Sequence, residues 1–203
     1  MGVKSHPAIQ FTLDLRFSFA MLIVQSQRAG QLVAYQTIKT RHPGRSPKGL
    51  MLSQLLNPQA IRIPLAARTK DDAIRELVDL AEKAHGINSD GDILSRVVRR
   101  ESMMSTGIGN GVAIPHGKTR QVDHLVAACA VSPAGVDFES VDGEPATLFI
   151  LLISPENVRG PHVKALASIS RLLKEQSVRD SLREAPSAEA FLQVLRDAEA
   201  RFL

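Results

Sequence analysis

The sequence predicts a layered α/β domain over residues 51–203, and three observations support this fold class. Amphipathic helical patterns alternate with short, continuous apolar runs along this part of the chain. The chain is 44% apolar and 23% charged, as an ordinary globular protein is. No apolar run approaches the roughly 18 residues that a membrane-spanning helix needs. We therefore expect one packed domain and no membrane insertion.

Two helical patterns open the domain. The first helix is predicted directly after Thr69, which can cap it, with Asp72 three residues later as in a capping box. Gly86 follows the last turn, where a left-handed residue often ends a helix. A second helix is predicted over about residues 89–102, and Arg100 lies in its last turn.

Two strands and two more helices follow. The runs HLVAACAVS (124–132) and ATLFILLIS (146–154) have strand length and almost no polar residues, which predicts strands buried on both faces. A helix is predicted over residues 161–175, with proline at its first position, and a last one over residues 187–202.

The single cysteine, Cys129, lies inside the first apolar run and is predicted to be a small core residue. One cysteine allows no internal disulfide, which fits a reducing compartment. The apolar run FAMLIV (19–24) is short, follows charged residues, and precedes no clear cleavage site, so we expect a cytoplasmic rather than a secreted protein.

Residues 1–50 differ in composition from the rest. They hold seven Lys or Arg and one acid, a net charge of +6, whereas the other 153 residues carry 18 basic and 20 acidic side chains. Residues 36–49 are basic and contain two prolines and two glycines, which is typical of a linker. We expect residues 1–50 to be a disordered basic extension, or an over-extended start before Met51. Because the domain itself has no basic excess, we expect no nucleic-acid binding.

The glycine-rich stretch STGIGNGVAIPHGKTR (105–120) admits several interpretations. A phosphate-binding loop would need glycine where Val112 stands, and Pro115 has no N–H to donate to a phosphate. The dinucleotide fingerprint fails at Val112 as well. His116, His124 and His162 do not have the spacing of a metal site, so we predict no metal and no cofactor.

A reactive histidine is the remaining interpretation, although a polar surface histidine in a loop stays open. The neutral ring of His116 is a good nucleophile, and Arg100 could neutralise a phosphate. Ser105, Thr106 and glycine N–H groups could donate hydrogen bonds to it. Gly117 could admit the backbone of a partner protein.

The residues near His116 each admit two interpretations. Val112, Ile114 and Met104 could form an apolar rim around the ring, or belong to the core. Lys118 could attract a phosphorylated partner or be a solvated side chain.

The block RRESMMSTGIGNGVAIPHGK (99–118) resembles the active-site block of type 2 enzyme IIA domains of the bacterial phosphoenolpyruvate-dependent phosphotransferase system. This is the mannitol/fructose class, which includes the nitrogen-related regulatory enzyme IIA. The resemblance runs from about Leu52 to Leu195. It implies a three-layer α/β/α fold with a mixed sheet flanked by helices, and a stand-alone IIA, because no IIB or IIC segment is recognised.

The resemblance also implies a protein-histidine phosphotransferase. His116 would accept phosphate, generally on Nε2, from an HPr-like phosphocarrier or its nitrogen-branch homologue. It would pass the phosphate to an enzyme IIB in sugar transport, or hold it as a regulatory signal. His162 matches a second histidine that orients the first or contacts the phosphate, and Arg100 matches the family's arginine.

Alternatives to these roles remain. His162 could be a partly buried polar residue at a helix start, and Arg100 a solvated cation at a helix end. The whole domain could be a phosphorylation-independent protein-binding module. Methionines at 103 and 104 replace the smaller residue that relatives often have before Ser-Thr-Gly, which affects the choice of partner more than the chemistry.

Overall fold

The computed structural model describes residues 51–203, so our expectation for residues 1–50 lies outside the described residues. In chain order the elements are η1 (Leu52–Leu55), η2 (Pro58–Ala60), β1 (Ile61–Arg62), α1 (Lys70–His85), α2 (Asp92–Met103), β2 (Gly107–Gly109), β3 (Val112–Ala113), β4 (His116–Thr119), β5 (Val126–Val136), β6 (Ala146–Pro155), α3 (Gly160–Lys174), α4 (Gln176–Arg183) and α5 (Ala188–Phe202), where η marks a short 3₁₀ helix.

The sheet is mixed and is organised around β6. Strand order along the main path is β1-β5-β6-β3-β2, and β4 also pairs with β6. β5 and β6 pair antiparallel, whereas β3 and β4 both run parallel to β6. Because β3 and β4 run parallel to β6, the chain reaches β6 through a long connection, which contains β5.

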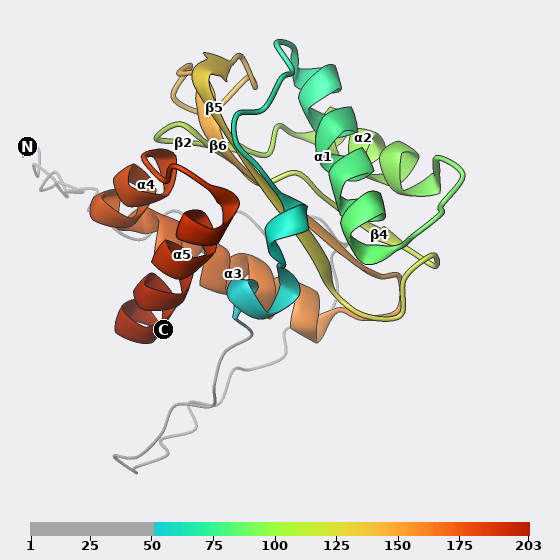
Figure 1. Cartoon of the computed structure of the whole chain (residues 1–203). Coiled ribbons are helices and arrows are strands. Elements are labelled where there is room, and N and C mark those ends of the chain that lie inside the picture. Colours follow the sequence, from blue (N-terminus) through green and yellow to red (C-terminus); the bar gives the residue numbers. More distant parts are fainter. Residues whose placement is uncertain (1–50) are drawn as a thin grey trace, which may run out of the picture. The chain divides into compact units, whose positions relative to one another are not determined.

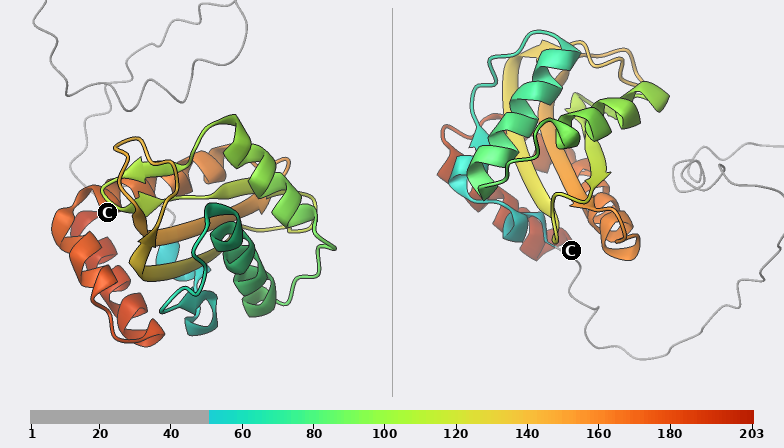
Figure 2. Two further views of the ribbon diagram at one scale, coloured as in Figure 1. Left: turned by 90° about the horizontal axis from the view of Figure 1, so that it is seen from above. Right: turned by 90° about the vertical axis from the view of Figure 1, so that its right-hand side faces the viewer.

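Helices cover both faces of this sheet (Figure 1). Side chains of β5 and β6 alternate between a core under α1 and α2 and a core under α3, α4 and α5, as expected for strands with period two. Figure 2 shows the two long strands between the two groups of helices. The predicted three-layer α/β/α fold is confirmed, and both long strands are buried on both faces.

The predicted helix signals hold for the first helix. The Thr69 side chain accepts a hydrogen bond from the N–H of Asp72, and Gly86 ends α1 with a φ of 65°. The second helix begins at Asp92 rather than at residue 89. Residues 89–92 form a turn closed by a hydrogen bond from the N–H of Asp92 to the carbonyl of Ser89, and Gly91 within it has a φ of 83°. Helices α3 and α5 begin and end within about a residue or two of prediction.

Two kinds of element were not predicted. Helix α4 is only eight residues long, and its amphipathic pattern is too short to recognise from sequence. It is held by packing, and its Arg179 donates hydrogen bonds to the carbonyls of Leu173 and Lys174, which end α3. The strands β1 to β4 have two to four residues each, so sequence periodicity cannot reveal them.

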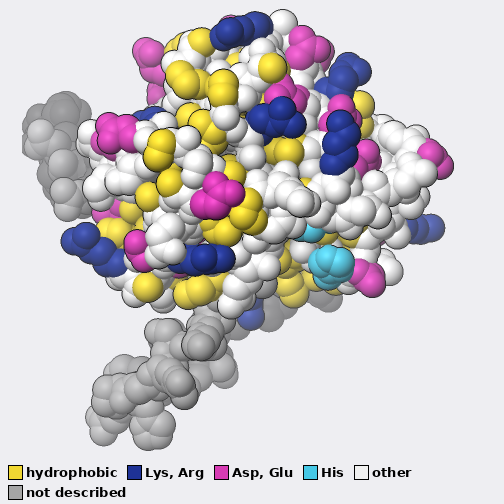
Figure 3. All heavy atoms as spheres, viewed as in Figure 1, with side chains coloured by type: hydrophobic (Ala, Val, Ile, Leu, Met, Phe, Trp, Pro, Cys, Tyr) yellow, Lys and Arg dark blue, Asp and Glu magenta, His cyan; other side chains and the backbone are white. Residues whose placement is uncertain are grey.

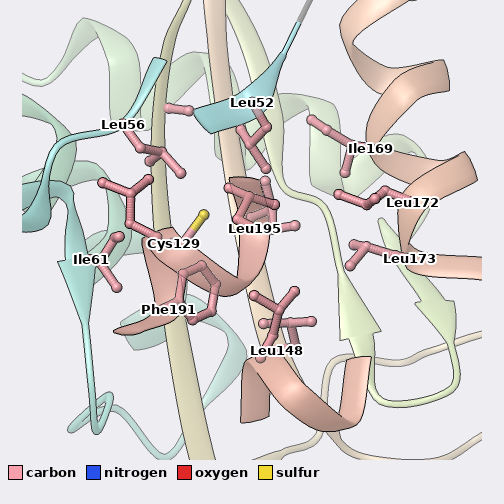
Figure 4. Close-up of a cluster of buried hydrophobic side chains, with 14 of the residues drawn as sticks. Leu52, Leu56, Ile61, Cys129, Leu148, Ile169, Leu172, Leu173, Phe191 and Leu195 are labelled. Carbon is pink, nitrogen blue, oxygen red and sulfur yellow. The ribbon is translucent and has the colours of Figure 1, made fainter. Parts of the chain in front are cut away.

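The core under α3, α4 and α5 contains Cys129, as predicted. Figure 4 shows it on β5 facing Phe191 and Leu195 of α5. The side chain is fully buried, and burial raises the pKa of its thiol. The thiol therefore stays protonated and unreactive.

Charges are mixed over the face of the molecule seen in Figure 3, where Lys and Arg alternate with Asp and Glu. This agrees with the near balance of charge over residues 51–203. Within these described residues, no helix is both long and apolar enough to cross a membrane.

Gly107, the first residue of β2, packs closely against Ser140. A Cβ there would lie 2.6 Å from Oγ and 2.9 Å from Cα of Ser140, and the backbone atom cannot move cheaply. We expect Gly107→Ala to destabilise the fold by about 1–3 kcal/mol in urea unfolding. Gly160→Ala is the control, because its Cβ would meet nothing within 4 Å at the first residue of α3. Equal stability of the two variants would contradict the predicted close contact.

Candidate functional site

His116 is the first residue of β4, a strand that the sequence analysis did not predict. Its partner in the parallel ladder is Leu152 of β6, so the central strand of the sheet fixes its backbone. The side chain is half-buried. A histidine on a paired strand is held more rigidly than one on a free loop, which suits a reactive group.

The ring of His116 is oriented by one hydrogen bond. Nδ1 lies 2.8 Å from the carbonyl oxygen of Ile114, and a carbonyl can only accept, so Nδ1–H donates. In the neutral ring this leaves a lone pair on Nε2. Burial, the main cause, lowers the pKa of His116 below its usual 6.5, and the charges of Arg100 and Lys118 act in the same direction. At neutral pH the Nε2 atom is therefore available as a nucleophile.

The structure brings His162 next to His116. The ring centroids are 5.6 Å apart and the rings are tilted by 52°. His162 lies in the first turn of α3, only 7% exposed, and its Nδ1 is 2.5 Å from Oγ of Ser154. Burial, and then the charges of His116, Lys118 and Arg100, lower its pKa to about 4. His162 is therefore a neutral histidine buried beside the first, rather than a solvated residue.

Arg100 joins the site through the packing of α2 against β4. A Cβ on Gly117 would lie 3.0 Å from Cγ2 and 3.3 Å from N of Val97, so only glycine lets the helix approach this closely. Arg100 follows Val97 by three residues and lies on the same helix face. Its Nη1 donates to the carbonyl of Met104 over 2.9 Å. Its charge reaches both histidines and lowers the pKa of each.

Gly117 therefore does not admit the backbone of a partner protein, contrary to what the sequence had suggested. It is buried against Val97 and does not open toward a partner protein. Lys118, the next residue, is half-buried, and its Nζ donates to the carbonyl of Val158 over 3.3 Å. Lys118 is thus a second cation held near both rings rather than a freely solvated side chain.

The expected apolar rim is only partly present. Val112 and Ile114 are 1% and 4% exposed and belong to the core, so they form no rim. Met104 is 58% exposed, as is Met103 beside it at 69%. The hydroxyls expected as phosphate donors already have partners: Ser105 donates to the carbonyl of Phe138 and Thr106 to Glu101.

Glu101 is a site-supporting residue that the sequence analysis missed. Its buried carboxylate accepts hydrogen bonds from the N–H and Oγ1 of Thr106 and forms an ion pair with Lys70 at 2.9 Å. The Thr106 carbonyl accepts from the N–H of Ile114, whose own carbonyl accepts from His116. This chain of bonds runs from α2 to the ring of His116. In the sequence, Glu101 is recognisable only as an acid directly after Arg100, and the neighbouring residues do not indicate that its side chain is buried.

The glycine-rich stretch does not have the topology of a phosphate-binding loop. A phosphate-binding loop leads from a strand into a helix N-terminus, whereas this stretch follows a helix and forms β2, β3 and β4. Among residues 51–203, no three His, Cys, Asp or Glu side chains converge as a metal site would require. His124 lies on the surface, paired with Asp123.

The sequence model of the family described as "Phosphoenolpyruvate-dependent sugar phosphotransferase system, EIIA 2" matches residues 54–198. The chain belongs to this family. A nitrogen regulatory protein of Bradyrhizobium diazoefficiens is 37% identical over 144 residues, which cover 71% of this chain and 94% of that protein. The fructose-specific EIIABC component of Bacillus subtilis is 35% identical over 146 residues, or 72% of this chain, and the match spans 23% of that protein.

Solved structures agree with this assignment. The nitrogen regulatory protein IIA-Ntr of Neisseria meningitidis superposes with a TM-score of 0.66 at 31% identity, covering 70% of this chain and 97% of that chain. The mannitol enzyme IIA of Escherichia coli, solved in complex with phosphorylated mannitol enzyme IIB, has a TM-score of 0.60 at 24% identity, with coverages of 70% and 97%. The second likeness supports the fold alone.

The low pKa of His162 predicts acid sensitivity. In the unfolded chain this ring binds a proton near pH 6.5, but in the folded protein only near pH 4. Between these values the unfolded state binds more protons, so the free energy of unfolding falls as the pH is lowered through this window. Urea unfolding from pH 7 to pH 4 should show this decline, and a shallower one for His162→Gln. NMR titration of His162 near pH 6.5 in the folded protein would contradict it.

Glu101→Gln should weaken both the fold and the orientation of His116. Removing one partner of a buried ion pair costs about 3 kcal/mol, measurable by urea unfolding. Because the charge of Glu101 raises the pKa of His116, its loss should lower that pKa further in an NMR titration. The control is Glu139→Gln, because Glu139 also pairs with Lys70, at 3.1 Å, but is 75% exposed. Equal effects of the two substitutions would contradict the role of Glu101.

Proposed function

We propose that this enzyme IIA domain, residues 51–203, carries a phosphoryl group on Nε2 of His116. The observation that carries the proposal is the hydrogen bond from Nδ1–H of His116 to the Ile114 carbonyl, which leaves Nε2 with its lone pair. The neutral ring of His162 and the cations Arg100 and Lys118 stand beside it. A strong nucleophile near positive charge and partly shielded from water suits the transfer of an anionic phosphoryl group.

The transfer can proceed without moving a proton. The donor is the phosphohistidine of an HPr-like phosphocarrier protein or its nitrogen-branch homologue. The donor ring carries a hydrogen on its other nitrogen. Its P–N bond breaks, a new P–N bond forms to Nε2 of His116, and the donor ring leaves as neutral imidazole while the positive charge of the phosphorylated ring passes to His116. Nδ1 of His116 keeps its hydrogen throughout. One P–N bond replaces another, so positioning and charge neutralisation supply most of the catalysis.

Two outputs are compatible with this site. The phosphoryl group can pass to an enzyme IIB in sugar transport, or the phosphorylated domain can regulate other proteins as the names of its nitrogen regulatory relatives suggest. A phosphate adds about two negative charges at the surface where a partner would bind, which is enough to change its affinity. Because phosphoenolpyruvate supplies the phosphoryl group inside the cell, we place this activity in the cytoplasm.

The test is phosphorylation with defined components. Purified protein is mixed with phosphoenolpyruvate, enzyme I and HPr or its nitrogen-branch homologue, and the intact mass is read at alkaline pH, where the P–N bond survives. We expect wild type and His124→Ala, a surface histidine, to gain one phosphoryl group, and His116→Ala to gain none. No gain in folded wild-type protein with either donor would overturn the proposal and favour a phosphorylation-independent binding module.

Arg100 should act in the transition state. Removing one preorganised donor to developing charge typically costs about 10²-fold in rate, so we expect Arg100→Ala to slow transfer to His116 by that order. The NMR-determined pKa of His116 should also rise, because Arg100 lowers it. Arg99→Ala is the matched control, exposed on the same helix turn, and should stay within about twofold of wild type. Equal rates for the two variants would contradict the role of Arg100.

A further inference from the structure

Ser154 connects the two histidines, and nothing in the sequence singled it out. It is the penultimate residue of β6, is fully buried, and lies opposite Lys118 in the ladder with β4. Its Oγ is 2.5 Å from Nδ1 of His162 and 3.5 Å from the carbonyl oxygen of Gly117. One hydroxyl therefore contacts both the strand that begins with His116 and the ring of His162.

A count of hydrogens decides how this hydroxyl bonds. The neutral His162 ring carries one hydrogen, and the Ser154 hydroxyl carries one. If Nδ1–H donated to Oγ, the hydroxyl hydrogen would be left with the Gly117 carbonyl at 3.5 Å, well beyond the range of about 2.5–3.0 Å that is typical of an O–H···O bond. If instead Oγ–H donates to Nδ1, the hydroxyl hydrogen lies in the 2.5 Å contact, where the ring nitrogen is its acceptor. The ring hydrogen of His162 is then on Nε2.

We propose that Ser154 is a positioning residue, which holds His162 in the tautomer with its hydrogen on Nε2 and so makes that ring a hydrogen-bond donor beside His116. The proposal rests on the proposed function, because the donor acts on a phosphoryl group carried by His116. The oxygens of that group are anionic acceptors. In the opposite tautomer His162 would present a lone pair to them and repel them.

The arrangement also separates the roles of the two rings. The Ile114 carbonyl accepts from Nδ1 of His116, which leaves its Nε2 free to form a bond. The Ser154 hydroxyl donates to Nδ1 of His162, which leaves its Nε2 with a hydrogen to donate. Two chemically identical side chains 5.6 Å apart thus become a nucleophile and a donor through opposite partners at the same ring atom.

The first test is the tautomer in the unphosphorylated wild-type protein. Long-range ¹H–¹⁵N correlation NMR of ¹⁵N-labelled protein near pH 7 distinguishes a protonated ring nitrogen from one with a lone pair. We expect His162 to carry its hydrogen on Nε2 and His116 on Nδ1. A hydrogen on Nδ1 of His162 would overturn the proposal. This readout does not depend on phosphorylation.

The second test is the rate of phosphoryl transfer to and from His116. Loss of one neutral hydrogen bond should slow Ser154→Ala by about two- to tenfold, and Ser154→Thr, which keeps the hydroxyl, should restore the rate. Ser132→Ala is the matched control, because Ser132 is a buried serine on β5 whose hydroxyl has no hydrogen-bond partner. It should transfer at the wild-type rate.

The two tests distinguish failure of the proposed role of Ser154 from failure of the proposed function. Transfer by folded Ser154→Ala at the wild-type rate would overturn the positioning role of Ser154, even with His116 phosphorylated normally. Absence of phosphorylation in wild type would instead overturn the proposed function, while the tautomer would still be measurable. If Ser154→Ala does not fold, the wild-type tautomer and the rate of Ser154→Thr decide, and a slow but folded Thr variant with unchanged tautomer would count against the proposal.

Discussion

The site depends on β6, because this strand places β4 and leads into α3, the two elements that carry the histidines. β4 pairs with β6 in parallel and puts His116 opposite Leu152. β6 ends near Ser154, and the chain then turns into α3, whose first turn carries His162. A central strand that is buried on both faces and hydrogen-bonded on both edges is among the most rigid parts of a fold. Two histidines 46 positions apart in sequence are therefore held at a fixed distance.

Electrostatics keep this site uncharged at the rings and positive around them. Burial disfavours a proton on either histidine, and Arg100 and Lys118 disfavour it further. The acid that opposes them, Glu101, is balanced by its ion pair with Lys70. A neutral pair of rings among cations is suited to an incoming anion, and it is an unfavourable place for an extra proton. A phosphoryl group with two negative charges would therefore change the electrostatic potential of the surface around these rings strongly.

Close packing explains two of the glycines in the stretch 105–120. Gly107 lies against Ser140 and Gly117 against Val97, so these glycines serve the approach of backbone to neighbouring elements. Val112 and Ile114 belong to the core rather than to a partner-binding surface. The stretch thus forms three short strands, of which β3 and β4 pair with β6 and β4 also packs against α2. The positions available to contact a partner are the exposed ones, such as Met103 and Met104.

From the sequence alone we could predict the α/β class, the two long buried strands and, within residues 51–203, four of the five helices. The residues themselves made His116 and Arg100 candidates, and the family resemblance added His162. Those features depend on local periodicity, on caps such as Thr69 and Gly86, and on one long motif, all of which are written in neighbouring residues. The folded chain alone shows that Glu101 is buried and bonded to Thr106, and that Ser154 contacts His162. It also shows that Gly117 packs against α2 rather than facing a partner. These facts arise from contacts between segments far apart in the chain, and hydrogen bonds and burial at such contacts leave no periodic signal in the sequence.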